Sequence, residues 1–117
     1  MTTTNAKLNN SIGLAMKAGK IASGDFSVEK AVRSGTAKLV MLAESASENT
    51  KKQWRDACSS RNIPLIRLRA MGSAIGKPAR MVAAVTDEGF SAMIIKNSNK
   101  NNEAMTELTE AMTDDKG

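Results

Sequence analysis

Residues 38–43 read KLVMLA, five consecutive apolar residues behind one lysine. A short, continuous apolar run is typical of a strand that is buried on both faces. Two further apolar runs follow it, LIRL at Leu65–Leu68 and RMVAAVT over residues 80–86, and a shorter candidate, KIAS, precedes it at Lys20–Ser23. The sequence therefore predicts four strands, with the 38–43 strand in the interior.

Helical patterns separate these strands. Apolar residues recur at helical spacing in four segments, at about 6–18, 26–34, 45–61 and 87–96, and a short helical turn is expected at Met71–Ile75. Strands that alternate with helices predict a sheet covered on both faces. The expected fold class is α/β, a three-layer α-β-α sandwich.

Residues with capping chemistry define where these helices begin and end. Asp25 is expected to cap the second helix, and Gly35 to end it. Ser45 and Glu48 have the spacing of a capping box for the third helix. On that helix, Trp54, Ala57 and Cys58 are expected to face the core, while Lys51, Lys52, Arg55 and Arg61 face water.

Length and composition favour one small globular domain. The chain has 117 residues, of which 41% are hydrophobic and 25% charged. We expect a domain over residues 1–97 and an acidic, flexible tail over 98–117, in which a marginal helix at Ala104–Met112 is the alternative to disorder. No signal peptide and no apolar stretch of membrane-spanning length are recognised, so a soluble cytoplasmic protein is expected.

The residue types needed for most enzyme chemistry are missing. The chain has no histidine and a single cysteine, Cys58, which excludes a Ser-His-Asp triad, a His general base and multi-Cys zinc sites. The run Gly72–Lys77 has one residue too few between its glycines for a phosphate-binding loop, and Pro78 stands where Ser or Thr is required. We therefore expect no enzyme activity, no cofactor and no metal.

The charge points to a polyanionic partner. The net charge is +5, but residues 1–100 carry 16 basic against 7 acidic side chains, while the last 17 residues are acidic. A basic domain attracts phosphate polymers before any specific recognition. The only aromatic residues are Phe26, Trp54 and Phe90, so a multi-aromatic stacking platform for single strands is not expected. Contacts through RNA shape, phosphate and backbone are favoured instead.

Two basic loop regions are the candidate contacts. The first, KIASGDFSVEKAVR at Lys20–Arg33, places Gly24 at a tight turn before a helix N-terminus, where free N–H groups favour anions. The second, RLRAMGSAIGKPAR at Arg67–Arg80, is rich in arginine and lysine. Strand–helix alternation can bring both loops to one end of the sheet, although the charges could also be solvated and unrelated.

The sequence resembles the L7Ae/L30e superfamily of ribosomal proteins and kink-turn RNA binders, and within it the bacterial YlxQ-type group. The resemblance covers about residues 8–96. It is carried by the pattern G-x(5)-K-A-V-R-x-G-x-A-K-L-V at Gly24–Val40, by NIPLIRL, and by G-x-x-x-G-K-x-A-R before the last apolar strand. It implies an α-β-α sandwich around a mixed four-stranded sheet.

The resemblance also implies a binding surface. Kink-turn binders of the superfamily use a Gly-x-Asn-Glu-x-x-Lys stretch at a helix N-terminus to contact tandem G·A pairs, and a small apolar loop to cover an extruded base. Here Gly24 and Lys30 match, but Phe26 replaces the Asn and Ser27 the Glu. Phe26 can stack on a base or pack inward, and Ser27 is short. The expected RNA contacts are Lys20, Gly24, Asp25, Phe26, Ser27, Lys30, Arg33, Arg69, Gly76, Lys77, Pro78, Ala79 and Arg80.

The expected function is non-enzymatic binding of structured RNA, linked to the ribosome or to translation. The expected partners are structured RNA, with ribosomal RNA as a candidate, and ribosomal or translation proteins; a monomer with no membrane contact is expected. The alternative is a protein-interaction module of the same fold that has lost kink-turn recognition.

Overall fold

The computed structural model describes residues 2–69, 75–76, 80–100 and 104–106. Its helices are α1 (Thr2–Lys17), α2 (Asp25–Ser34), α3 (Glu48–Ser60) and α5 (Glu88–Lys100). Its strands are β1 (Ile21–Ser23), β2 (Leu39–Ala43), β3 (Leu65–Leu68), β4 (Val82–Val85) and β5 (Ala104–Thr106). The four predicted strands are all present, and the turn expected at Met71–Ile75 lies outside the described residues except for Ile75.

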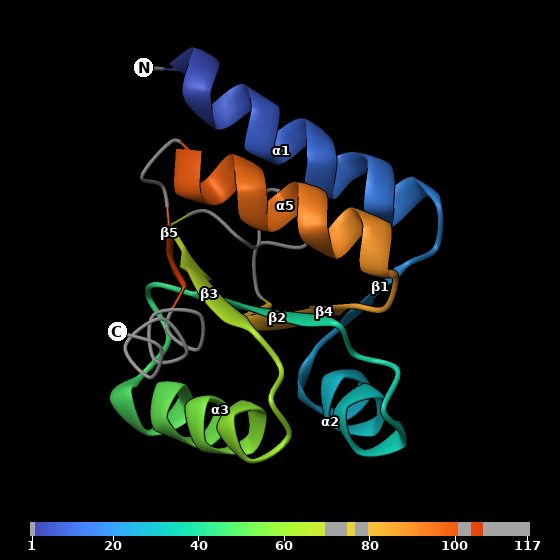
Figure 1. Ribbon diagram of the computed structural model, residues 1–117. Coiled ribbons are helices and arrows are strands. Elements are labelled where there is room, and N and C mark those ends of the chain that lie inside the picture. Colours follow the sequence, from blue (N-terminus) through green and yellow to red (C-terminus); the bar gives the residue numbers. More distant parts are fainter. Residues whose placement is uncertain (1, 70–74, 77–79, 101–103, 107–117) are drawn as a thin grey trace, which may run out of the picture.

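The strands form one mixed sheet in the order β1-β4-β2-β3-β5. β2 and β3 are parallel, whereas β4 runs antiparallel to both β1 and β2. Helices α1 and α5 cover one face of this sheet, and α2 and α3 cover the other (Figure 1). The predicted α-β-α sandwich with a mixed sheet is therefore confirmed.

Alternate residues of the inner strands feed two separate cores. Leu39, Met41 and Ala43 of β2 pack in the cluster that includes residues of α1 and α5. Val40 and Leu42 point to the opposite face and pack in the cluster that includes Trp54 and Cys58 on α3 and Val28 on α2. Because neighbouring side chains on a strand point to opposite faces, an uninterrupted apolar run is what a doubly covered strand requires.

The start of α2 differs from the prediction. Gly24, not Asp25, is the N-cap residue, and no side chain caps this helix. The backbone of Gly24 has φ 93° and ψ 154°, and its N–H donates to the carbonyl of Val82 at 3.0 Å. The turn from β1 into α2 is tied to β4 in this way, so the helix begins one residue earlier and Asp25 occupies its first turn. Gly35 ends α2 in the left-handed conformation, as predicted.

The start of α3 also differs. Ser47 is the N-cap, and its Oγ accepts a hydrogen bond from the N–H of Thr50 at 3.2 Å. The predicted cap, Ser45, lies in the turn that follows β2, where the N–H of the buried Ala46 donates to the carbonyl of Ala43. This turn is needed before the chain can reverse, so the helix starts two residues later than the capping-box spacing indicates.

Lys51 was expected to face water, but it is buried. Only 8% of the residue is exposed, and its Nζ lies 3.7 Å from the exposed carboxylate of Glu48. Lys51 lies three and seven residues before Trp54 and Cys58, which places all three on the core-facing side of α3. Its aliphatic stem covers apolar surface while the charged end reaches Glu48.

The chain adds one strand that the sequence did not predict. Ala104–Thr106 forms β5, antiparallel to β3, so the alternative of a helix over Ala104–Met112 is wrong at these residues. The predicted tail begins too early, because residues 98–100 still belong to α5, and its residues 101–103 and 107–117 lie outside the described residues. Among the described residues, no helix combines the length and apolar character needed to cross a bilayer.

Shortening one side chain of β2 tests the importance of the burial of this strand on two faces. Leu42 is fully buried, and replacing it with alanine leaves a cavity that the layers cannot close. We expect Leu42→Ala to lower the free energy of unfolding by about 2–5 kcal/mol in urea denaturation. Leu14→Ala removes the same atoms from a side chain that is 53% exposed, and we expect a change within about 0.5 kcal/mol. Equal effects of the two substitutions would contradict this account of the core.

Candidate nucleic-acid interface

One edge of the sheet collects the ends of four strands. β1, β2 and β3 end there and β4 begins there, because Ser23 pairs with Ala83, Leu42 with Val82, and Ala43 with Leu68. Three of the predicted RNA contacts, Gly24, Arg69 and Arg80, therefore flank this edge. The acidic residue Glu44, which follows β2, lies there as well. We call it the Gly24 edge. The two basic loop regions do meet at one end of the sheet, as the strand–helix alternation allows.

Arg80 of the second loop lies against Gly24 of the first. A Cβ atom placed on Gly24 would lie 2.6 Å from Nη1 of Arg80 and 3.4 Å from Cζ. The guanidinium thus occupies the space that any side chain at position 24 would fill. A glycine is also needed for the backbone itself, because φ 93° with ψ 154° is a conformation that other residues rarely adopt.

The N-terminus of α2 concentrates positive potential at the same place. The first N–H groups of a helix have no acceptor within the helix, and here no side chain supplies one. The N–H of Val28 donates to the carbonyl of Gly24 at 3.0 Å, which begins the helical pattern. The N–H groups of Asp25, Phe26 and Ser27 precede it and belong to the first turn, beside the Arg80 guanidinium. Both the helix dipole and the arginine favour an anion at this position.

Exposed cations continue along α2 from this point. Lys30 is exposed, and the Arg33 side chain is 72% exposed while its Nη2 contacts Glu29 Oε2 at 2.9 Å. Beside them is an open hollow of about 350 Å³. The residues that line it lie on one face of α2 and span about two turns: Phe26, Glu29, Lys30, Arg33 and Ser34.

Phe26 does not pack inward. It is 81% exposed, the most exposed of the large hydrophobic residues that the structure describes. Of the two possibilities that the sequence left open, stacking on a ligand is the one compatible with this position. Ser27 is also exposed, one residue further along the first turn of α2.

Several predicted residues lie elsewhere. Lys20 precedes β1 at the opposite end of that strand, where its carbonyl accepts a hydrogen bond from Thr86 N–H at 2.8 Å. The sheet therefore separates Lys20 from the Gly24 edge. Gly76 is exposed with φ 75°, in a conformation suited to glycine, but no contact among the described residues places it at the Gly24 edge. Lys77, Pro78 and Ala79 lie outside the described residues.

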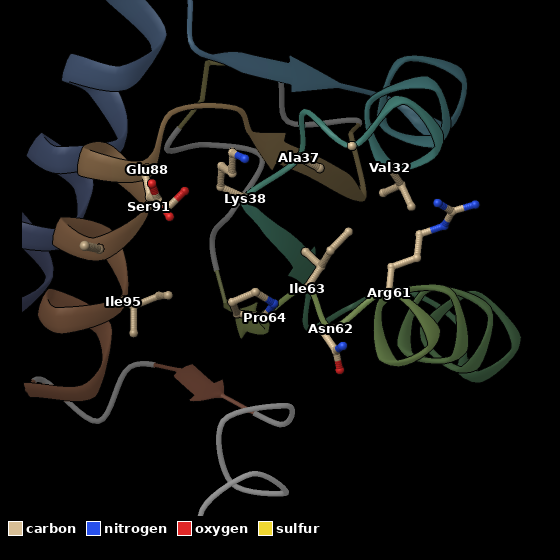
Figure 2. A pocket seen from close by; sticks show the side chains of 12 residues that line it. Val32, Ala37, Lys38, Arg61, Asn62, Ile63, Pro64, Glu88, Ser91 and Ile95 are labelled. Atoms are coloured by element: carbon tan, nitrogen blue, oxygen red, sulfur yellow. The ribbon is translucent and has the colours of Figure 1, made fainter.

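The opposite end of the sheet holds a larger groove, of about 520 Å³, that the sequence did not indicate. Figure 2 shows Glu88, Ser91 and Ile95 of α5 on one side, Arg61 on the other, and Lys38 between them. The end of α2 with the loop that follows it, the loop after α3, and the helix α5 form this groove, and they are distant in sequence, so no local pattern could reveal it. Its charges are mixed, and none of the predicted contact residues lines it.

Comparison with known proteins identifies the family. A model of the ribosomal protein L7Ae/L30e/S12e/Gadd45 family matches residues 6–95 of the chain. The chain belongs to this family. Two relatives are each called RNA-binding protein YlxQ: that of Bacillus subtilis (strain 168) is 44% identical over 87 residues, covering 72% of this chain and 87% of the relative. That of Enterococcus faecium is 41% identical over 88 residues, covering 73% and 84%.

Solved structures have the same architecture. A Bacillus halodurans protein of unknown function superposes with a TM-score of 0.75 at 39% identity, covering 80% of this chain and 98% of that one. The Giardia lamblia 15.5kD RNA binding protein superposes with a TM-score of 0.65 at 18% identity, covering 86% and 88%. At that identity, the second likeness shows that the fold of the family is shared.

Cys58, the single thiol of this family member, lies in the core. Burial raises the pKa of the Cys58 thiol from 9.0 to about 12, and the residue is 1% exposed. A thiol with a raised pKa is a poor nucleophile, because the thiolate is the reactive form. Within the described residues, no group of three or more side chains of the kinds that hold metals comes together.

Replacing Gly24 tests the close approach of Arg80. We expect Gly24→Ala to lower the free energy of unfolding by about 1–3 kcal/mol, because alanine strains this backbone conformation and displaces the guanidinium. Gly13→Ala is the matched control: nothing lies within 4 Å of the new Cβ, and the helix interior should gain about 0.5–1 kcal/mol. Thermal unfolding of both variants measures the difference, and a Gly24→Ala protein as stable as wild type would refute it.

The burial of Cys58 can be tested by thiol labelling and pH. A thiol-specific reagent at pH 8 should react with the unfolded chain and leave the folded protein nearly unlabelled. The unfolded thiol loses its proton near pH 9.0 and the folded one only near pH 12. The contribution of Cys58 to stability is therefore complete below pH 9.0 and declines as the pH rises toward 12. Urea denaturation from pH 8 to 11 should show this part of the decline in wild type and not in Cys58→Ala.

Proposed function

We propose that this protein binds structured RNA without catalysing a reaction, and that the Gly24 edge is the binding surface. One observation carries the proposal: the Arg80 guanidinium lies against Gly24 at the uncapped N-terminus of α2. Two positive groups, a guanidinium and the end of a helix dipole, are held side by side. Both groups favour a phosphate placed between them, in competition with the exposed Asp25 carboxylate of the same turn.

The surrounding charges extend this phosphate site into a surface. Lys30 and Arg33 follow on α2, and Arg69 follows β3 at the same edge. Within the described residues, Lys30, Arg69 and Arg80 form no ion pair. Because a run of phosphates is the ligand that repeated exposed cations attract most strongly, a nucleic acid fits this edge better than a single small anion.

The relatives support RNA as the nucleic acid. The two curated relatives are named RNA-binding proteins, and each is matched over more than four fifths of its own length. The pattern of the resemblance, from Gly24 through Lys30 to Val40, includes the helix start at the Gly24 edge. We further propose cytoplasmic action as a monomer on ribosomal RNA or another RNA of the translation machinery, with ribosomal or translation proteins as neighbours.

At positions 26 and 27 this surface differs from the kink-turn motif, so recognition of kink-turn RNA would have to use other chemical groups there. The Asn and Glu expected at positions 26 and 27 donate and accept hydrogen bonds at base edges, whereas Phe26 offers a ring face and Ser27 a short hydroxyl. Gel shifts with a kink-turn RNA and with a plain duplex, at two salt concentrations, separate the cases. Tighter, salt-resistant binding to the kink-turn RNA would indicate base readout, and equal, salt-sensitive binding would indicate phosphate contacts alone. Binding to neither RNA would favour a protein partner for the same fold.

A double substitution tests the position of the surface. We expect Lys30→Ala with Arg80→Ala to weaken RNA binding on the order of tenfold at low salt, and to reduce the slope of log affinity against log salt by about two. The reason is that two phosphate contacts, and the counterions they release, are lost. Fluorescence anisotropy over a salt series measures both quantities.

The matched control removes the same charges from the opposite end of the sheet. Lys38→Ala with Arg61→Ala deletes one exposed lysine and one exposed arginine beside the larger groove. This variant should keep the wild-type affinity within about twofold, with a slope lowered by well under two. If it is the weaker binder of the two double variants, the surface is at the opposite end of the sheet and the proposal is wrong.

A further inference from the structure

We propose that the hollow along α2 receives one unpaired nucleobase of the bound RNA, which stacks on the ring of Phe26. This inference rests on the proposed RNA-binding function and specifies a subsite within it. Phe26 would then supply by stacking what the residue expected at this position supplies by hydrogen bonds.

The exposure of Phe26 is the first observation. The other two aromatic residues contact the core: Trp54 is 3% exposed, and Phe90 is half-buried and packs against the cluster that includes residues of α1 and α5. Phe26 alone is turned outward, at 81%, in the first turn of α2. Leaving a phenyl ring in water forfeits most of the free energy that its burial would contribute. The fold does not need the ring, which leaves it free to contact a ligand.

The hollow beside the ring is the second observation. It measures about 350 Å³, and the ring of Phe26 forms its only aromatic wall. Glu29, Lys30 and Arg33 also line it, within two turns of Phe26 along α2. A nucleotide has the matching parts: a flat base for the ring, a phosphate for the cations, and N–H groups on its edge for a carboxylate.

The chemistry of the hollow fits a nucleotide. Its lining is mostly apolar, and every residue that contributes to it except Phe26 also carries a charge or a hydroxyl group. A flat base can cover the apolar lining, whereas an apolar protein surface offers no group to Glu29, Lys30 and Arg33 and would have to remove their water, which is costly for charged groups. A nucleotide instead replaces that water with its own polar atoms. The hollow also lies on the same helix that begins at the phosphate site of the Gly24 edge, so the base and the backbone of one RNA can be bound together.

The first test compares affinities for two RNAs. One is a hairpin duplex with a three-nucleotide bulge, and the other is the same hairpin fully paired. Wild type should bind the bulged RNA more tightly, and Phe26→Ala should lose about tenfold on the bulged RNA and almost nothing on the paired one. Phe26→Tyr keeps a ring and should restore wild-type affinity. Leu14→Ala, which shortens another exposed apolar side chain in the α1 layer on the other face of the sheet, should change neither affinity.

The second test observes the stacking itself. Phe26→Trp places an indole at the hollow, whereas the native Trp54 is buried and serves as an internal reference. Titration with the bulged RNA should quench the emission of the exposed indole, and titration with the paired RNA should leave most of it. Leu14→Trp places an exposed indole away from the Gly24 edge and should show no quenching with either RNA.

The outcomes separate this inference from the proposed function. If Phe26→Ala binds both RNAs as wild type does, or loses the same factor on both, the base subsite does not exist while RNA binding at the Gly24 edge still stands. If the indole at position 26 is not quenched by the bulged RNA, the stacking geometry is wrong. If wild type binds neither RNA, the proposed function itself fails.

Discussion

The burial of β2 on both faces is the constraint on which the rest of the fold depends. Each of its five residues is buried, and successive residues enter different cores. The strand lies between β4 and β3, so it also supplies backbone hydrogen bonds on both sides. Neither layer of helices could remain in place without it. Because β2 fixes the sheet, it also fixes where the neighbouring strands begin and end.

The binding surface follows from that geometry. Three strands end and one begins at the Gly24 edge, which brings the turn before α2 and the segment before β4 together although they are more than fifty residues apart in sequence. The glycine lets the arginine approach, and the short turn lets the helix start at the edge. The proposed phosphate site is thus made of backbone and one side chain, and the proposed base subsite is a separate ring. Both are attached to elements that the core holds rigidly.

Much of this arrangement could be predicted from the sequence. The KLVMLA run identified the interior strand, and the alternation of patterns gave the layers, because burial on two faces leaves a periodicity that one sequence displays. The convergence of the Gly24 and Arg80 regions was expected from the same alternation. Phe26 could be singled out from its mismatch with the family motif, but only the structure shows that it points outward.

Other features depend on contacts that a local pattern does not contain. Asp25 and Ser45 have capping chemistry, yet the backbone of β4 and a turn after β2 set the helix starts instead. Lys51 has the helical spacing of a core residue on α3 but the charge of a surface residue, and its place on the core-facing side of the helix determined its burial. Lys20 is the first residue of a candidate region in sequence, but the three residues of β1 carry the chain from Lys20 to the opposite end of the sheet, where Gly24 lies.

The strand β5 has a consequence for how the protein can be shortened. β5 pairs with β3 along Ile66–Leu68, on the side of β3 away from β2. A chain cut after α5, where the acidic composition begins, would leave an apolar strand with a row of unsatisfied N–H and C=O groups. Such an open edge pairs readily with another copy of itself. Without β5, the sheet could extend from one molecule into the next. A shortened chain whose end was chosen from composition alone would therefore aggregate through β3.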